Sequence, residues 1–299
     1  MRHSYAPLAI LICSLLWACS DGSDHPALPQ FQPIPQPQLE IPPDIGQIAL
    51  ISTEFALDTV EYSATEYFVS GRASAFGNSG ELTPDGRWTV SAVDEADFRT
   101  RIVVYRPSQA EDFSGTVYVE WLNVTSGFGT APVWRSTHTE LIRRGHAWIA
   151  VDAQRVGIEG NPTAVIPLPF YLKAANPERY ASLDHPGDSF SYDIFAQIAQ
   201  AVRAPGELDP LAGLSAQRII AAGQSQSASR LTTFYNALQA VYGAFDGYLL
   251  LARPVSVYQQ FTDGESSGVL TSGSAPLLQA DIPDNMPPAR VEIRGDVQA

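Results

Sequence analysis

The sequence predicts an α/β fold with a mostly parallel sheet and helices on both faces. Short apolar runs rich in β-branched residues recur along the chain, and strands that are buried on both faces have this pattern. Segments with helical spacing alternate with these runs, and such alternation builds a parallel sheet with right-handed crossovers. With 299 residues, of which 45% are hydrophobic, the chain can form the core of one large domain.

The expected elements fall into two groups. From about residue 47 the polarity alternates between Gly, Pro and Asp turns, which predicts extra N-terminal strands near residues 48–57, 66–72, 88–93 and 101–106. The parallel part then has strands at residues 116–123, 147–152, 218–222 and 245–252. Helices are expected at residues 134–144, at 189–202 with Asp188 or Ser189 as the N-cap, and after Ser225.

A short segment with a central serine joins the strand at residues 218–222 to the next helix. It reads Gly223-Gln-Ser225-Gln-Ser227. Strand, tight turn with a central serine, and helix form the layout of a nucleophile elbow, which exposes the serine hydroxyl at the end of the strand. Gly223 removes a side chain where the two arms of the turn approach each other. Ser227 replaces the second glycine of the usual pattern, and an ordinary strand-to-helix loop is the alternative interpretation.

Residues 1–18 predict a secretory signal peptide. A basic residue, Arg2, precedes an apolar run that is too short to span a bilayer. The run ends in Leu16-Trp-Ala-Cys19, which resembles a bacterial lipoprotein box, whose cysteine is lipidated and becomes the first residue of the mature protein. Lipidation of Cys19 would anchor the exported protein in the cell envelope, in the periplasm or at the outer membrane. Trp17 departs from the usual small residue, and ordinary signal cleavage nearby is the alternative.

Residues 19–45 predict a flexible tether, because they are rich in Pro, Gln, Ser and Asp. The domain is expected to occupy residues 46–299. Cys13 and Cys19 are the two cysteines of the chain, and Cys13 would leave with the signal peptide. The mature chain can therefore form no internal disulfide, and the membrane is expected as a partner only through Cys19.

Charge and composition exclude several classes of function. The net charge is −14, long basic runs are absent, and Lys173 is the single lysine. Nucleic-acid binding thus lacks its electrostatic basis, and the acidity is interpreted as a contribution to solubility. The mature sequence has no H-x-x-H or H-E-x-x-H motif and no cysteine pair, so neither a metal site nor a cofactor is expected.

The histidines are the candidates for a general base. Residues 154–188 carry many Pro and Gly and little periodicity, which predicts a segment that covers the strand ends and contributes binding surface. His185 lies in this segment and is a candidate pocket residue. The other four histidines are assigned to the signal peptide (His3), the tether (His25), a helix (His138) and a turn (His146).

Five stretches together resemble the α/β-hydrolase superfamily, and specifically a bacterial family of alpha/beta hydrolase domain proteins. The resemblance extends from about Ile48 to the end of the chain. It is carried by residues 119–124 (Val-Glu-Trp-Leu-Asn-Val), 138–145 (His-Thr-Glu-Leu-Ile-Arg-Arg-Gly), 153–160 (Ala-Gln-Arg-Val-Gly-Ile-Glu-Gly), 183–194 (Leu-Asp-His-Pro-Gly-Asp-Ser-Phe-Ser-Tyr-Asp-Ile) and 222–228 (Ala-Gly-Gln-Ser-Gln-Ser-Ala).

The resemblance implies a serine hydrolase fold with Ser225 as the nucleophile. Two backbone N–H groups would form the oxyanion hole: that of Gln226, and that of Asn123 or Val124 in the loop after the third strand of the fold. An Asp or Glu and then a histidine would follow the nucleophile along the chain. The resemblance implies no particular substrate.

The chain as given has acidic residues after Ser225 but no histidine. The end resembles the lead-in to a further strand, beyond which the acid and base of this family would normally come. We therefore expect a fold that is incomplete at its C-terminus and a protein that is inactive or impaired as a catalyst. The alternative is a complete chain that uses His185 or His138 as a base out of the usual order.

Two functions follow from these observations. The first is an exported serine hydrolase that acts on a small-molecule carboxylic ester. The second is a non-catalytic binding or scaffold protein of the cell envelope, because the visible sequence lacks a full catalytic set. The sequence gives no indication of the oligomeric state.

Overall fold

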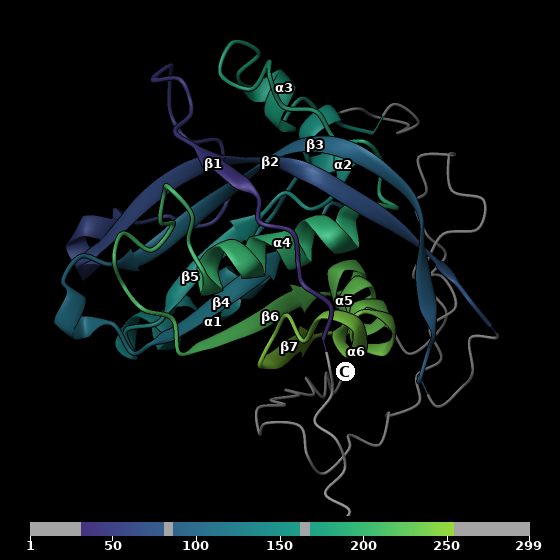
Figure 1. Cartoon of the computed structure of the whole chain (residues 1–299). Coiled ribbons are helices and arrows are strands. Elements are labelled where there is room, and N and C mark those ends of the chain that lie inside the picture. Colours follow the sequence, from purple (N-terminus) through teal and green to yellow (C-terminus); the bar gives the residue numbers. More distant parts are fainter. Residues whose placement is uncertain (1–30, 81–85, 162–167, 254–299) are drawn as a thin grey trace, which may run out of the picture. The chain divides into compact units, whose positions relative to one another are not determined.

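The structure, a computed structural model, describes residues 31–80, 86–161 and 168–253. These residues contain a seven-stranded sheet with the strand order β1-β2-β3-β5-β4-β6-β7 (Figure 1). The strands are β1 (Gln38–Glu40), β2 (Tyr62–Asn78), β3 (Val90–Pro107), β4 (Thr116–Trp121), β5 (Ala147–Val151), β6 (Arg218–Gln224) and β7 (Gly247–Leu251). The helices are α1 (Pro132–Arg143), α2 (Arg155–Glu159), α3 (Leu172–Ala175), α4 (Ser191–Arg203), α5 (Gln226–Ala237) and α6 (Gln239–Tyr242), with 3-10 turns at Leu57–Val60 and Ala110–Asp112.

The sheet combines an antiparallel N-terminal part with a parallel part. The pairs β1–β2, β2–β3 and β3–β5 are antiparallel. The pairs β5–β4, β4–β6 and β6–β7 are parallel. The carboxyl ends of β4, β5, β6 and β7 therefore meet at one edge of the sheet, where α/β proteins place their sites. The predicted α/β architecture with extra N-terminal strands is confirmed.

Two details of the predicted strands are wrong. The segments at residues 88–93 and 101–106 belong to one 18-residue strand, β3. Its polar middle is tolerated because the far end of the β2–β3 pair faces solvent, where Arg72 bonds Glu95 and Asp97. Residues 48–57 form no strand beyond a single bridge at Ile51, because their alternating apolar side chains pack against the core without a ladder of backbone hydrogen bonds.

Alternate residues of the central strands supply two separate cores, one on each face of the sheet. In β5, Ala147, Ile149 and Val151 join the first core, whereas Trp148 and Ala150 join the second. Successive side chains of a strand point to opposite faces of the sheet, and both faces are buried here. Consecutive residues of such a strand are therefore mostly apolar, which explains the continuous apolar runs in the sequence.

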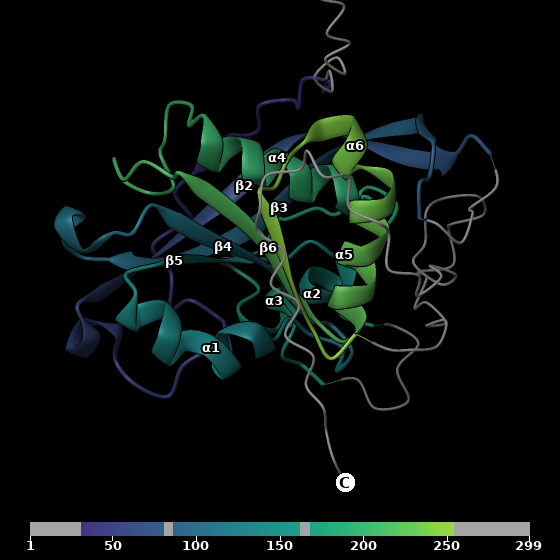
Figure 2. The same ribbon diagram turned by 90° about the horizontal axis from the view of Figure 1, so that it is seen from below.

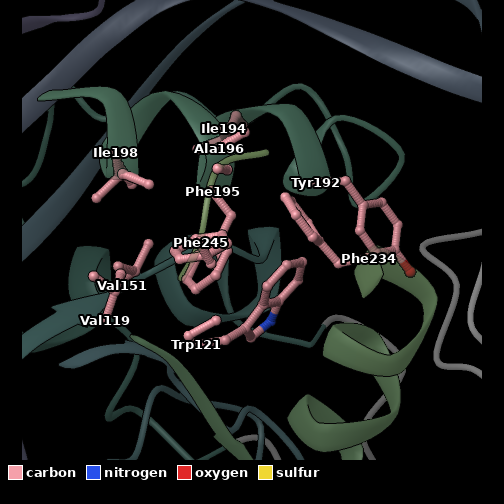
Figure 3. Packing of buried hydrophobic residues seen from close by; sticks show 14 of the residues in the cluster. Val119, Trp121, Val151, Tyr192, Ile194, Phe195, Ala196, Ile198, Phe234 and Phe245 are labelled. Atoms are coloured by element: carbon pink, nitrogen blue, oxygen red, sulfur yellow. The ribbon is translucent and has the colours of Figure 1, made fainter. Parts of the chain in front are cut away.

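Helices cover both faces of the sheet (Figure 2). The second core contains Trp134 and Leu141 of α1. The first contains the buried faces of α4 and α5, and Figure 3 shows Phe195 of α4 packed among Trp121, Phe234 and Phe245. The ring centroids of Phe195 and Trp121 are 5.0 Å apart. None of the helices in the described ranges is long and apolar enough to cross a membrane.

The compact unit begins at Phe31, within the segment expected as a tether to residue 45, although most side chains of residues 31–45 are exposed. Strand β1 pairs with β2, and Glu40 forms an ion pair with Arg99 at 2.6 Å. Leu39 packs against the first core, so the segment gains both backbone pairing and apolar contact. The sheet therefore includes a strand before residue 46, where the domain was expected to begin. Residues 1–30, with the predicted signal peptide and Cys19, lie outside the described residues.

The carboxylate of Glu120 connects β4 to the start of α1. It is fully buried and accepts hydrogen bonds from the N–H groups of Val133 at 2.8 Å and Trp134 at 2.9 Å, and from Trp148 Nε1 at 2.9 Å. Burial raises the pKa of Glu120 to about 8, although these three donors favour the charged form. Glu120 thus supplies the cap that α1 lacks from its own residues.

We expect the contribution of Glu120 to the free energy of unfolding to fall with rising pH. A carboxyl whose pKa is raised from 4.5 to about 8 keeps, in the folded protein, a proton that the unfolded chain releases. Its stabilising contribution is complete below about pH 4.5, declines by at most about 1.4 kcal/mol per pH unit, and is lost above about pH 8. Urea unfolding of wild type and Glu120→Gln at acidic, neutral and alkaline pH measures the difference, and a difference independent of pH contradicts this expectation.

Candidate active site

Ser225 occupies the turn between β6 and α5 in a backbone conformation that residues with a side chain rarely adopt. Its φ is 56° and its ψ is −116°, and its N–H donates to the carbonyl oxygen of Leu251 at 2.9 Å. The turn places Ser225 at the carboxyl edge of the sheet, immediately before the N-terminus of α5. A strained serine between a central strand and a helix is the geometry of a nucleophile elbow.

Gly223 is required by the close approach of α5 to β6. A Cβ atom at this position would lie 3.0 Å from the backbone carbon of Ser227 and 3.1 Å from its oxygen. The predicted role of Gly223 at the contact between the two arms is confirmed. Ser227, where the usual pattern has a glycine, is buried and donates from Oγ to the carbonyl oxygen of Leu122 at 3.2 Å.

The loop after β4 is fastened beside the serine turn. Asn123 Nδ2 donates to the carbonyl oxygen of Gln224 at 2.9 Å, and Asn123 and Thr130 exchange two backbone hydrogen bonds of 2.9 Å each. The Asn123 N–H is therefore engaged, which removes it as an oxyanion donor. Its side chain instead holds the loop against the residue before Ser225. Among the described residues, the N–H groups of Val124 and Gln226 have no acceptor, and both remain candidates.

His185 lies buried in the loop before α4. It is 3% exposed, its Nε2 lies 2.9 Å from the carbonyl oxygen of Ala153, and its Nδ1 accepts the Gly187 N–H at 3.2 Å. This pattern fixes the tautomer with the proton on Nε2, because Nδ1 acts as an acceptor. Both ring nitrogens are engaged among the described residues, so His185 connects two loops there, and its place in a pocket stays a prediction.

The other described histidines also lie away from the turn. His138 in α1 contacts the Trp134 carbonyl oxygen through Nδ1 at 3.2 Å, and the His146 Nδ1 lies 2.6 Å from Ser114 Oγ at the amino end of β5. Within the described ranges, no histidine hydrogen-bonds Ser225. The first acid after the nucleophile, Asp246, precedes β7 and binds the Ile219 N–H, so it too lies at the amino ends of the strands. The later acids, from Asp263 to Asp296, fall outside the described residues.

A buried polar network that the sequence did not reveal lies behind the turn. The Gln226 side chain donates from Nε2 to Gln154 Oε1 at 2.9 Å, and Gln154 donates from Nε2 to Asp188 Oδ2 at 2.7 Å. Asp188 also accepts from Arg230 and from the Arg155 N–H, each at 3.0 Å. Asp188 was expected to cap α4, but no side chain caps that helix, whose N-cap is Phe190. The sequence indicates this network only through the position of Gln154 and Asp188 in two of the five stretches that carry the family resemblance.

A second buried network supports the same edge of the sheet. Asp152 follows β5, and its Oδ2 accepts from Arg101 Nε at 2.6 Å. Arg101 also binds Glu66 at 3.2 Å, and Glu66 binds Arg179 at 2.7 Å. Burial raises the pKa of Asp152, and the Arg101 guanidinium opposes this shift. The Asp152 Oδ1 would lie 2.8 Å from a Cβ at Gly129, so the loop after β4 needs a glycine there.

A hollow of about 710 Å³ lies between α1 and strands β4, β6 and β7. Thr116, His146 and Arg218, which line it, come from the amino ends of their strands. Ser225 follows the carboxyl end of β6, so this hollow is not the candidate active site. The described ranges contain no group of three His, Cys, Asp or Glu side chains that could hold a metal ion.

We expect Gly223→Ala to destabilise the protein by about 1–3 kcal/mol, because the added methyl group would overpack the contact between β6 and α5. Gly80→Ala is the matched control, since a Cβ there meets no atom within 4 Å. Urea unfolding of both variants measures the effect. Equal stabilities of the two variants would show that the backbone of the turn accommodates the methyl group at no cost, and that the close approach of α5 to β6 does not require a glycine.

The comparisons with known proteins place the chain in a family. The family described as alpha/beta hydrolase domain matches residues 31–295. No curated protein matches the sequence. Solved structures that match include a serine hydrolase without a lid from Xanthomonas campestris, with 16% identity, a TM-score of 0.32, and coverage of 54% of this chain and 59% of that one.

Two further solved structures are esterases. Acetyl xylan esterase 1 from Thermoanaerobacterium sp. matches with 14% identity and a TM-score of 0.34, over 74% of this chain and 54% of that one. Esterase 2 from Thermogutta terrifontis matches with 12% identity and a TM-score of 0.35, over 64% of each chain. The match spans between 46% and 64% of the length of the first four structures. With a family match over residues 31–295 and the sheet described above, the chain belongs to the alpha/beta hydrolase domain family.

Proposed function

We propose that the protein is a serine hydrolase that cleaves carboxylic esters of small molecules with Ser225 as its nucleophile. The observation that carries the proposal is the positive φ of Ser225 at the junction of β6 and α5. A conformation that costs on the order of 1–3 kcal/mol persists where the surroundings enforce it, as nucleophile turns require. Esters are favoured over peptides by analogy with the fold, which most often serves ester chemistry.

The reaction divides into acylation and deacylation. In acylation, Ser225 Oγ attacks the carbonyl carbon of the ester, its proton passes to a general base, and the alcohol leaves with a proton. In deacylation, water attacks the acyl-serine, the acid is released, and Ser225 regains its hydrogen. The N–H groups of Gln226 and Val124 would bind the oxyanion of each tetrahedral intermediate, aided by the positive end of α5.

The general base and acid are not among the side chains that surround Ser225 in the described residues. No histidine follows Ser225 in the sequence, and the three described histidines bond elsewhere. Loss of a triad member leaves only the catalysis of the oxyanion hole and of binding, roughly 10³–10⁴-fold over water. We therefore propose that the 299-residue chain turns over esters slowly.

We expect a fluorophosphonate probe to label the wild type at Ser225 and to leave Ser225→Ala unlabelled. Ser225 is half-buried, and its hydroxyl is a weak nucleophile without a base, so we expect labelling to be slow and to depend on the oxyanion donors beside the turn. Ser229→Ala, in the same helix, is the control and should retain labelling. Mass spectrometry of the modified peptide identifies the residue. A folded wild type in which prolonged incubation labels Ser225 no faster than surface serines would remove the nucleophile assignment and favour a binding protein without turnover.

We expect short-chain p-nitrophenyl esters to be hydrolysed slowly. Prior reaction with the probe should lower the rate of hydrolysis in proportion to the fraction of Ser225 that is labelled. Turnover at the rate of an ordinary esterase, abolished by Ser225→Ala and also by His185→Ala or His138→Ala, would contradict the proposed absence of a base. Stoichiometric ligand binding that Ser225→Ala leaves unchanged, without turnover, would support the alternative of an envelope binding protein.

We also propose that the protein is exported and anchored to the bacterial cell envelope through a lipid on Cys19. The support is the sequence alone, from the signal pattern and the lipoprotein-like box. Wild type should partition into the detergent phase, and Cys19→Ala should alter processing and partition into the aqueous phase. A mature wild type found in the aqueous phase would refute the anchor.

A further inference from the structure

Three buried side chains form a continuous connection from the serine turn to the loop before α4. Gln226, Gln154 and Asp188 come from three separate segments, and each is at most 5% exposed. The contacts between them measure 2.9 and 2.7 Å. Gln154 Oε1 accepts a second hydrogen bond, from Trp121 Nε1 at 3.0 Å, so the central amide is held by three partners.

Asp188 reaches the N-terminal part of α5 by two routes. It binds Arg230 directly at 3.0 Å, and it reaches Gln226 through Gln154. Gln226 and Arg230 are four residues apart and thus lie on the same face of the helix. Two attachments one turn apart fix both the position of the helix start and its rotation about its own axis.

The loop that carries Asp188 is itself fastened to the segment after β5. His185 Nε2 donates to the Ala153 carbonyl oxygen at 2.9 Å, and Asp188 Oδ1 accepts the Arg155 N–H at 3.0 Å. These contacts flank Gln154 on both sides. The amide of Gln154 is therefore directed toward Gln226 by a rigid frame rather than by its own rotamer preference.

The direction of the Gln226 peptide matters because its N–H is one of the two expected oxyanion donors. Among the described residues, the Gln226 side-chain oxygen has no hydrogen-bond partner, so the bond from its Nε2 to Gln154 is what orients this side chain. In a buried site, loss of one partner leaves the other group unsatisfied, and the turn would shift to regain a hydrogen bond.

We infer that Gln154 and Asp188 are positioning residues that aim the Gln226 N–H at the oxyanion. This inference rests on the proposed function of Ser225 as a nucleophile. Neither side chain touches the reacting atoms. They act through Gln226, and their removal misdirects a donor whose complete loss costs about 10²–10³-fold in comparable enzymes.

A buried carboxylate elsewhere supplies the matched control. Asp193 in α4 is as deeply buried as Asp188 and accepts from the Ser74 N–H at 2.7 Å, Tyr242 Oη at 2.7 Å and Gln197 at 3.1 Å. Its partners lie on β2, on α4 and at the end of α6, and none belongs to the serine turn. Asp193→Asn thus reproduces the loss of a buried charge without touching the proposed positioning path.

The experiment compares the full chain as wild type, Gln154→Leu, Asp188→Asn and Asp193→Asn. Phosphonylation of Ser225 by a fluorophosphonate probe is followed over a range of probe concentrations at a temperature where all four proteins are folded. We expect the maximal labelling rate to fall at least about tenfold in Gln154→Leu and Asp188→Asn. The probe concentration that gives the half-maximal labelling rate should change little. The rate of Asp193→Asn should remain within about twofold of wild type.

Hydrogen exchange of the peptide around Ser225 provides a second readout. It should be faster in Gln154→Leu and Asp188→Asn than in wild type and Asp193→Asn. Labelling rates equal to wild type in both network variants would overturn the inference, even if exchange were faster, because the network would then be only structural. Labelling of Ser225 in the wild type that is no faster than labelling of surface serines would overturn the proposed function, and the catalytic role of the network with it.

Discussion

The backbone of Ser225 is the constraint on which the site depends. A residue with a side chain at φ 56° and ψ −116° costs on the order of 1–3 kcal/mol, and the surrounding structure must offset this cost. The strand before Ser225 lies inside the parallel part of the sheet, and α5 after it packs into the first core. The hydrogen bond from the Ser225 N–H to Leu251 closes the turn from the side of β7.

The sheet and the loops packed against it contain several buried ion pairs. Arg101 and Arg179 face Asp152 and Glu66, and Arg230 faces Asp188. Removal of one partner from such a pair would leave a buried charge uncompensated, which costs about 3–5 kcal/mol. These networks connect segments that are distant in the sequence, and the one at Asp188 reaches α5, the helix that follows Ser225.

The elements that depend on local pattern could be predicted from the sequence. Strand β5 is buried on both faces and therefore reads as a continuous apolar run, and the helices after β4 and β6 show a clear period. The serine turn was recognisable because Gly223, Ser225 and the flanking elements are adjacent in the chain. The segment at residues 48–57 has the sequence pattern of a strand because its apolar side chains pack alternately on a core, but it lacks a ladder of backbone hydrogen bonds.

The parts of the site that depend on long-range contacts could not be predicted. Asn123 is one of the two residues expected to supply the second oxyanion N–H, but the carbonyl oxygen of Thr130, seven residues later, accepts its N–H. Asp188 had the local signature of a helix cap, yet its carboxylate bonds Gln154 and Arg230, which are distant in sequence. His185 was in the expected loop, and only the fold shows that Ala153 and Gly187 occupy both of its ring nitrogens.

The most direct test of the account is a crystal structure of the protein after reaction with a fluorophosphonate. Ser225 should carry the phosphonyl group, and one phosphonyl oxygen should lie about 2.7–3.1 Å from the backbone nitrogens of both Gln226 and Val124. The positive φ of Ser225 should be unchanged, because the turn is formed before reaction. An adduct on another residue, or a phosphonyl oxygen that faces solvent with neither N–H in range, would contradict the assignment of this turn as the catalytic site.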